Sequence, residues 1–394
     1  MLGPYAAILR KRQVQVVLGS SVLAGLSVGL PLAIVLMVQR ETGDFASAGA
    51  VAGCIALANA ATGPWRGRLL DRFGHPRTLR PLAIIAATAL VALVLATEAG
   101  AALPVLIGLG LLNGATTAPL LSSMRPLWAD LVDHPDQMQH AYALQAILLE
   151  VFFISGPLVA ALLIGLGSPS AAALAIGACQ LVGVLAFAAT PASRSWRGAA
   201  REVGWEGALA SPGMRALIVI DVPFGALFGT LDVAVPAFAK SHGSAAAAGA
   251  ALAALAVASM VGGIVYGARP PRGRRATRYV VLLATMTVLM VPLVLAQSIA
   301  WLIVGMALAG LLVAPSSTLG LGLLDDLAAA GTAAEATAWV STAYGLGLAI
   351  GTLLGGPLVD GPGTTAAFAA ACGLCGVATL IAVAGRRRLS AYDP

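Results

Sequence analysis

The tetrapeptide Gly156-Pro157-Leu158-Val159 occurs again, unchanged, as Gly356-Pro357-Leu358-Val359. The same spacing of 200 residues relates other short matches, which are Gly25 with Gly225, Gly49 with Gly249, Gly63 with Gly263, and the Gly-Leu-Leu triplets at 110–112 and 310–312. Single matches of Gly or Ala are common in such a composition, but a constant offset without gaps across five helices is not. The sequence therefore predicts a duplication, with two halves of similar structure in one chain.

The composition places both halves in a membrane. Of the 394 residues, 59% are hydrophobic and only 10% are charged, with a mean hydropathy of +0.91. A soluble protein carries roughly a quarter charged residues to cover its surface, so this chain is not soluble. A helix that crosses the hydrocarbon needs about 20 mostly apolar residues. This length predicts twelve spans, at 14–38, 46–64, 80–97, 102–122, 141–164, 170–189, 216–238, 245–266, 279–296, 299–321, 336–358 and 365–384.

We therefore expect an all-α integral membrane protein built from two six-helix halves. The predicted organisation is an N-terminal half at 1–190, a cytoplasmic interfacial linker at 191–214 and a C-terminal half at 215–394. An N-terminus in the cytoplasm places all but two of the 23 basic residues on the cytoplasmic side, the exceptions being Arg40 and Lys240. This distribution follows the positive-inside rule and puts both termini in the cytoplasm, with the chain in the cytoplasmic membrane. We expect a monomer in the bilayer, without a nucleic-acid partner.

A motif follows the second predicted span. It reads Gly67-Arg-Leu-Leu-Asp71-Arg72-Phe-Gly74-His-Pro-Arg77 and resembles motif A of the major facilitator superfamily, with Pro76 at one of the usual basic positions. Gly67 and Gly74 permit close backbone approach and a tight turn. Asp71 can accept hydrogen bonds from a helix N-terminus or from arginines across the boundary between the two halves. The resemblance covers essentially the whole chain. It implies a transporter fold in which this loop helps to hold the cytoplasmic side closed.

The Gly156-Pro157 pair, followed by two alanines, resembles part of the superfamily's motif C, which is an antiporter signature. The final glycines of that motif are alanines here, and Gly356-Pro357 is the copy in the second half. Proline removes a backbone hydrogen bond and glycine lets helices approach closely, so both pairs predict helix bends. The resemblance favours export over import, and a plain packing kink is the alternative reading.

Three acidic residues fall inside predicted spans, Glu150 in the fifth and Asp221 and Asp232 in the seventh. Ionisable groups in hydrocarbon are costly and are therefore functional candidates. Eleven residues correspond to about 16 Å of helix, so the two aspartates share one face at different depths. No lysine or arginine is predicted at comparable depth. We expect Glu150 to be the main proton carrier, ahead of Asp232 and Asp221, whereas a structural hydrogen bond to a neighbour such as Gln145 is the alternative for Glu150.

Four other polar residues are candidates for the substrate cavity. Asn59, Asn113 and Gln145 lie in otherwise apolar spans, where they line the cavity or bond across helices. Arg125 lies at the cytoplasmic end of the fourth span, where it snorkels to the interface or contacts an anion. Both interpretations remain open for each residue.

These features predict a secondary transporter rather than an enzyme, because no nucleophile–base pair and no metal-ligand cluster is readable. No cofactor or metal is expected, and the absence of a phosphate-binding Gly-Lys motif argues against an ATP-driven pump, so the proton gradient would supply the energy. The preferred function is proton-coupled export of a small organic molecule. An importer of a sugar, amino acid or other metabolite, and a membrane sensor without transport, are the alternatives. The low aromatic content (5%) disfavours an aromatic cage for cations. The lack of a predicted buried base disfavours an anionic substrate.

Overall fold

The structure is a computed structural model that describes residues 9–131, 137–196, 211–268, 273–328 and 333–390. All regular structure in these ranges is helical. Eleven helical segments in this part of the chain are long and apolar enough to cross a membrane. Helix α6 (Leu103–Thr116) is a shorter apolar helix, and α7 (Leu120–Leu131) follows it after a short break. The predicted fold class, a twelve-span all-α membrane protein, is confirmed.

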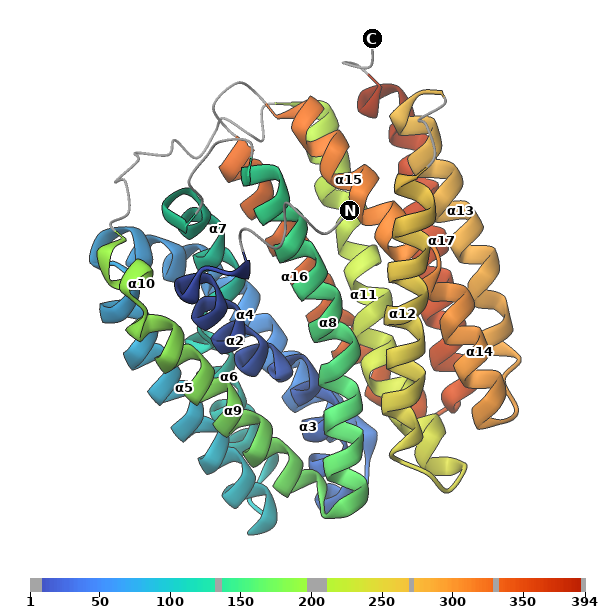
Figure 1. Ribbon diagram of the computed structural model, residues 1–394. Helices are drawn as coiled ribbons and strands as arrows, with labels where there is room; N and C mark the ends of the chain where they lie inside the picture. The colour runs from blue at the N-terminus through green and yellow to red at the C-terminus, as the bar shows by residue number, and fades with distance from the viewer. Residues whose placement is uncertain (1–8, 132–136, 197–210, 269–272, 329–332, 391–394) are drawn as a thin grey trace.

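The spans follow one another in sequence order. The first six consist of α2 (Arg12–Gly25), the 3-10 turn η1 (Leu26–Gly29), α3 (Leu30–Thr42), α4 (Phe45–Phe73), α5 (His75–Glu98), α6 with α7, α8 (Gln137–Leu166) and α9 (Pro169–Ala189). After the short α10 (Pro191–Ser195) come α11 (Pro212–Ser241), α12 (Ala247–Gly267), α13 (Arg275–Val294), α14 (Ile299–Gly310), α15 (Val313–Leu327), α16 (Ala333–Asp360) and α17 (Thr364–Leu389). In Figure 1 the first set lies on the left and the second on the right, with α8 and α16 at the boundary, which we call the seam.

The two ends of the bundle differ in charge. Described arginines gather where α4 ends, where α13 begins and where α17 ends, for example at Arg72, Arg275 and Arg386. We call this the basic end, which is uppermost in Figure 1, and the other the opposite end.

Glycines bring α11 and α16 into backbone contact. A Cβ on Gly225 or Gly229 would collide with carbonyl groups of α16, and one on Gly347 or Gly351 would collide with carbonyl groups of α11. Each pair is spaced by four residues, the small-xxx-small pattern that lets membrane helices approach closely. The hydroxyl of Thr230 also donates to the carbonyl of Gly351 at 3.3 Å. This contact fixes α16 between α11 on one side and α4 on the other.

The sequence repeat recurs as a repeat of contacts. Gly110 packs on Val51 and Ile55 of α4, and Gly310, 200 positions later, packs on Leu255 of α12. Across the seam, Gly49 meets Thr352 and Gly356, and Gly249 meets Pro157 and Ala161. Equivalent residues therefore make equivalent contacts at positions far apart in the chain.

Three spans differ from their predicted form. Helix α4 continues to Phe73, nine residues beyond the predicted end at 64, because helix-forming residues carry it past the apolar stretch until Gly74 ends it with a φ of 78°. The fourth crossing breaks between Thr116 and Leu120, and the tenth breaks between Gly310 and Val313. Hydropathy detects apolar length and does not detect these helix breaks.

Candidate functional site

The two sets of helices are joined across the seam at the opposite end. The carboxylate of Asp360, the last residue of α16, accepts hydrogen bonds from the backbone N–H groups of Phe45 (3.0 Å) and Ala46 (2.6 Å) at the start of α4. Lys240 of α11 donates to the side chain of Gln39 of α3. Together with the glycine contacts of Gly49 and Gly249, these bonds close the seam at this end.

Glu150 lies on the face of α8 that forms the seam. Pro157 and Ala161, which touch Gly249 of α12, follow it by seven and eleven residues, so all three share one helical face. Glu150 is half-buried, about 11 Å along the axis from the Pro157 contact at 1.5 Å per residue. No ion pair involves it in the described ranges. Glu150 therefore lies on the seam between the closed end and the basic end.

Asp221 and Asp232 lie on the same stripe of α11 as Phe224 and Phe228, since the four residues follow one another at intervals of three, four and four. Asp221 is 8% exposed and Asp232 is half-buried. Tyr344 of α16 lies within electrostatic range of both carboxyl groups. Within the described part of the chain, neither aspartate forms an ion pair.

Three aromatic rings meet beside these carboxyl groups. The rings of Phe224 and Phe228 lie edge to face with centroids 5.4 Å apart, and the Tyr344 ring lies 6.4 Å and 6.2 Å from them. Phe228 and Tyr344 are partly exposed, whereas Phe224 is buried. Sequence analysis missed this cluster because Tyr344 is more than 100 residues from Phe228, and only the close α11–α16 packing brings them together.

Arg66 corrects one expectation. The predicted second span ends at 64, which leaves Arg66 outside it, and the sequence predicts no buried base. The extended α4 instead carries Arg66 inside the protein, where it is only 3% exposed. Its guanidinium donates to the carbonyl of Thr117, where the fourth crossing breaks, and to the carbonyl and side-chain oxygens of Asn59. Burial lowers the pKa of Arg66 to about 10. The spacing of seven residues from Asn59 could have revealed the contact if the helix had been extended.

The other polar candidates have defined surroundings. Asn59 is exposed on α4 and holds Arg66. Asn113 is buried and donates to the carbonyl of Ala86 at 2.9 Å, which is a bond between α6 and α5. Gln145 accepts a hydrogen bond from the buried indole of Trp128 at 2.8 Å. The side chain of Arg125 lies outside the described residues.

The motif A segment begins as helix and ends in a turn. Gly67, Asp71 and Arg72 lie in the last turns of α4, and Gly74 adopts the positive φ that the turn requires. Among the described residues no atom lies within 4 Å of a Cβ built on Gly67, so none of them approaches this glycine closely in this conformation. Arg77, in the first turn of α5, is exposed, and the side chain of Asp71 lies outside the described residues.

The turn after α4 is covered by the connection between the two sets of helices. His75 is fully buried, and its ring stacks on Trp196 with centroids 4.1 Å apart. Neither ring nitrogen of His75 has a hydrogen-bond partner among the described residues. The indole of Trp196 packs on the protein here because α10 lies against the start of α5.

Both Gly-Pro pairs lie at helix contacts. A Cβ on Gly156 would meet the backbone of Gly29, and one on Gly356 would meet the backbone of Phe45. Helices α8 and α16 continue through Pro157 and Pro357. Each pair therefore occurs where a long helix packs closely against another.

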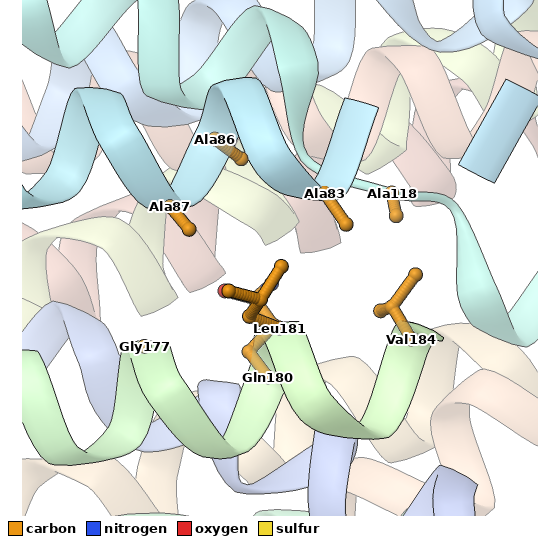
Figure 2. A pocket seen from close by; sticks show the side chains of 8 residues that line it. All are labelled: Ala83, Ala86, Ala87, Ala118, Gly177, Gln180, Leu181 and Val184. Atoms are coloured by element: carbon orange, nitrogen blue, oxygen red, sulfur yellow. The ribbon is translucent and has the colours of Figure 1, made fainter. Parts of the chain in front are cut away.

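Two cavities lie away from the carboxyl groups. Figure 2 shows the first, of about 10 Å³, between Ala83, Ala86 and Ala87 of α5 and four residues of α9, with Ala118 of the break in the fourth crossing at its edge. It has room for about one water molecule and is too small for a substrate. The second, of about 400 Å³, lies at the basic end between α12 and α13, beside Tyr266, Arg274 and Arg278.

Two bundles of membrane helices, with polar groups at the seam between them, define a twelve-span membrane transporter. The sequence matches the family model of the Major Facilitator Superfamily over residues 17–334 and again over 224–392. The chain belongs to the Major Facilitator Superfamily. The second match begins at α11 and overlaps the first, as expected if each half resembles part of the family pattern.

Solved structures share this fold at low sequence identity. The nucleoside transporter NupG is 14% identical with a TM-score of 0.72, over 97% of this chain and 100% of the other. A peptide transporter POT in complex with sulfate is 14% identical with a TM-score of 0.72, over 97% and 96%. The human organic anion transporter MFSD10 is 14% identical with a TM-score of 0.62, over 95% and 100%. No curated protein sequence matches the chain significantly.

Proposed function

We propose that the protein is a proton-coupled secondary transporter of a small organic molecule that works by alternating access. The observation that carries this proposal is the placement of Glu150 on the α8 face that forms the seam, without an ion-pair partner in the described ranges. A carboxyl group at that position meets water from one side at a time as the seam opens and closes. Asp232 and Asp221 would assist, and Asp71 with its neighbouring arginines would act at the basic end.

The described conformation is closed at the opposite end. If the basic end faces the cytoplasm, as the positive-inside rule predicts, this conformation is open toward the cell interior. Both termini would then be cytoplasmic, and residues 1–190 and 215–394 would be the two moving halves joined by 191–214. We take the protein to act as a monomer in the cytoplasmic membrane, without a cofactor.

Export is the direction we propose. Its support is the resemblance of the Gly156-Pro157 pair to part of the antiporter motif C. The proline of this pair meets Gly249 of α12 across the seam. The names of the similar structures do not state a direction. An importer would raise the cellular content of its solute when expressed, and an exporter would lower it.

Proteoliposomes with a pH gradient test the coupling. Purified protein is reconstituted, a panel of solutes is added, and proton movement is followed with an internal pH dye. We expect the unaltered protein to move protons in response to its solute, and Glu150→Gln to lose this response. Glu98→Gln, at the exposed end of α5, is the matched control and keeps it. Normal coupled proton movement by Glu150→Gln would refute the assignment of Glu150, and solute binding without any flux would favour a sensor.

A further inference from the structure

The stripe Asp221, Phe224, Phe228 and Asp232 on α11, together with Tyr344 on α16, forms one surface that we name the acid–aromatic face. We propose that this face is a recognition site for an organic cation, such as a protonated amine or a quaternary ammonium or phosphonium group. The inference rests on the proposed transport function and names the substrate class that the transporter would take.

Charge supports this assignment. Two carboxyl groups lie on one stripe of one helix, and the described residues supply neither with a cationic partner. Two tyrosines lie in electrostatic range of these carboxyl groups, Tyr344 of both aspartates and Tyr279 of α13 of Asp221. A tyrosine hydroxyl can donate a hydrogen bond to a carboxylate and cannot neutralise it. No described side chain therefore supplies a positive charge to this face, and a cationic ligand would supply it.

The rings supply the second component of a cation site. A cation within about 6 Å of an aromatic face is attracted by the negative potential of the ring. Phe228 and Tyr344 are partly exposed, with centroids 6.2 Å apart, and Asp232 follows Phe228 by one helical turn. An organic cation could therefore contact two rings and one carboxylate at once. The low overall aromatic content had argued against such a cage, but the cluster uses only three aromatic residues.

The duplication provides an internal comparison. The positions 200 residues earlier hold Ser21, Ala24, Val28, Leu32 and Leu144, so the first half builds the same helices without any acid or aromatic ring there. The fold therefore does not require these side chains. Their concentration in the second half alone indicates a role in recognition rather than in packing.

Depth fits a central substrate site. At about 1.5 Å per residue, Phe228 lies roughly 24 Å from the first residue of α11, a helix of 30 residues that spans about 45 Å. The rings are thus close to the middle of the membrane. Asp221 and Asp232 lie on either side of this level, so a cation that enters from the basic end meets Asp221 before it reaches Asp232.

Proton coupling follows from the same face. A protonated carboxyl group loses the charge that attracts a cation, so a proton and the substrate compete for Asp232. The proton and the substrate replace each other on Asp232 without any covalent step. Their exchange across the membrane is therefore an antiport. Lower pH should therefore weaken cation binding.

Equilibrium binding of radiolabelled tetraphenylphosphonium to the purified full-length protein tests the inference. Tetraphenylborate, an anion of nearly the same size and shape, is the matched probe. We expect saturable binding of the cation alone, weakening as pH falls. Asp232→Asn should raise its Kd at least about tenfold, and Phe228→Leu and Tyr344→Leu, which each remove one ring, should raise it about fivefold. Asp326→Asn, which changes a partly exposed acid paired with Arg275 at the basic end, is the charge-matched control.

Size-exclusion profiles and melting temperatures identify variants that fail to fold. If Asp232→Asn is one of them, Phe228→Leu and Tyr344→Leu still test whether the cation binds to this face. Equal binding of both probes, or cation binding that Asp232→Asn and Phe228→Leu leave unchanged, would overturn the cation site. The assay needs no gradient, so its result is separate from proton coupling. Proton-linked flux of an uncharged solute without any tetraphenylphosphonium binding would refute the cation site and leave the proposed function intact.

Discussion

The carboxylate of Asp360 on α16 caps α4 on the other side of the seam, with the N–H of Phe45 3.0 Å away. The first N–H groups of a helix have no partner within that helix, and its N-terminus attracts negative charge. The residue 200 positions earlier is Ala160, and α12 begins without a side-chain cap. The bond between α4 and α16 therefore has no counterpart between α12 and α8, so the two sides of the seam are held unequally.

Replacing Asp360 with alanine should favour opening of the opposite end. Hydrogen bonds to a charged group contribute about 1.5–3 kcal/mol, which is a change of roughly tenfold or more in the balance between conformations. Labelling rates of a cysteine introduced at Gln39 would measure the opening. Asp44 directly precedes α4 and caps it from within the same half. Asp44→Ala should leave the labelling rate nearly unchanged, because the bond that it removes does not cross the seam. An equal rise in both variants would contradict the interpretation.

Adding a methyl group to Gly351 should destabilise the protein. Its Cβ would collide with the carbonyl of Ala226, and backbone atoms cannot move aside as a flexible side chain can. Overpacking of this kind costs about 1–3 kcal/mol, so Gly351→Ala should lower the melting temperature in detergent. Gly373→Ala is the control, since no atom lies within 4 Å of a Cβ on this exposed helical residue, and we expect an unchanged or slightly higher value.

Removing the Arg66 guanidinium should loosen the break in the fourth crossing. Arg66→Met leaves the carbonyl of Thr117 without this donor, at a cost of about 1–3 kcal/mol. Hydrogen exchange of the peptide that covers residues 114–121 should become faster. Arg80→Met, which removes an exposed arginine of α5, should not change it. Unchanged exchange in Arg66→Met would show that other contacts hold the break.

Replacing Trp196 with alanine should expose the turn after α4. The indole covers His75, a buried residue whose ring nitrogens have no hydrogen-bond partner in the described part of the chain. Loss of the stack should let diethylpyrocarbonate modify His75 at least several-fold faster, as mass spectrometry would show. Trp301→Ala, at the start of α14 in the second set of helices, is the control for loss of an indole. Protection of His75 in Trp196→Ala would mean that another element covers it.

The fold was largely predictable from sequence because the membrane imposes simple conditions on it. Every span needs a long apolar stretch, so composition alone located them, and the 200-residue repeat grouped them into two sets. Helix ends were less predictable, as α4 shows, since a helix can continue beyond the hydrocarbon while its residues become polar. Arg66 was misplaced for this reason.

The three membrane carboxyl groups were also visible in sequence, because charge is conspicuous among apolar residues. Their surroundings were not. Tyr344 reaches Asp221 and Asp232 only because glycines bring α11 and α16 into backbone contact, and Asp360 reaches Phe45 only because α4 and α16 meet at the seam. Sequence thus determined the spans, the duplication and the candidate acids, since these depend on local composition and periodicity. Tertiary structure alone decided which side chains share a surface, because side-chain contacts between helices depend on how closely and in which register the helices pack.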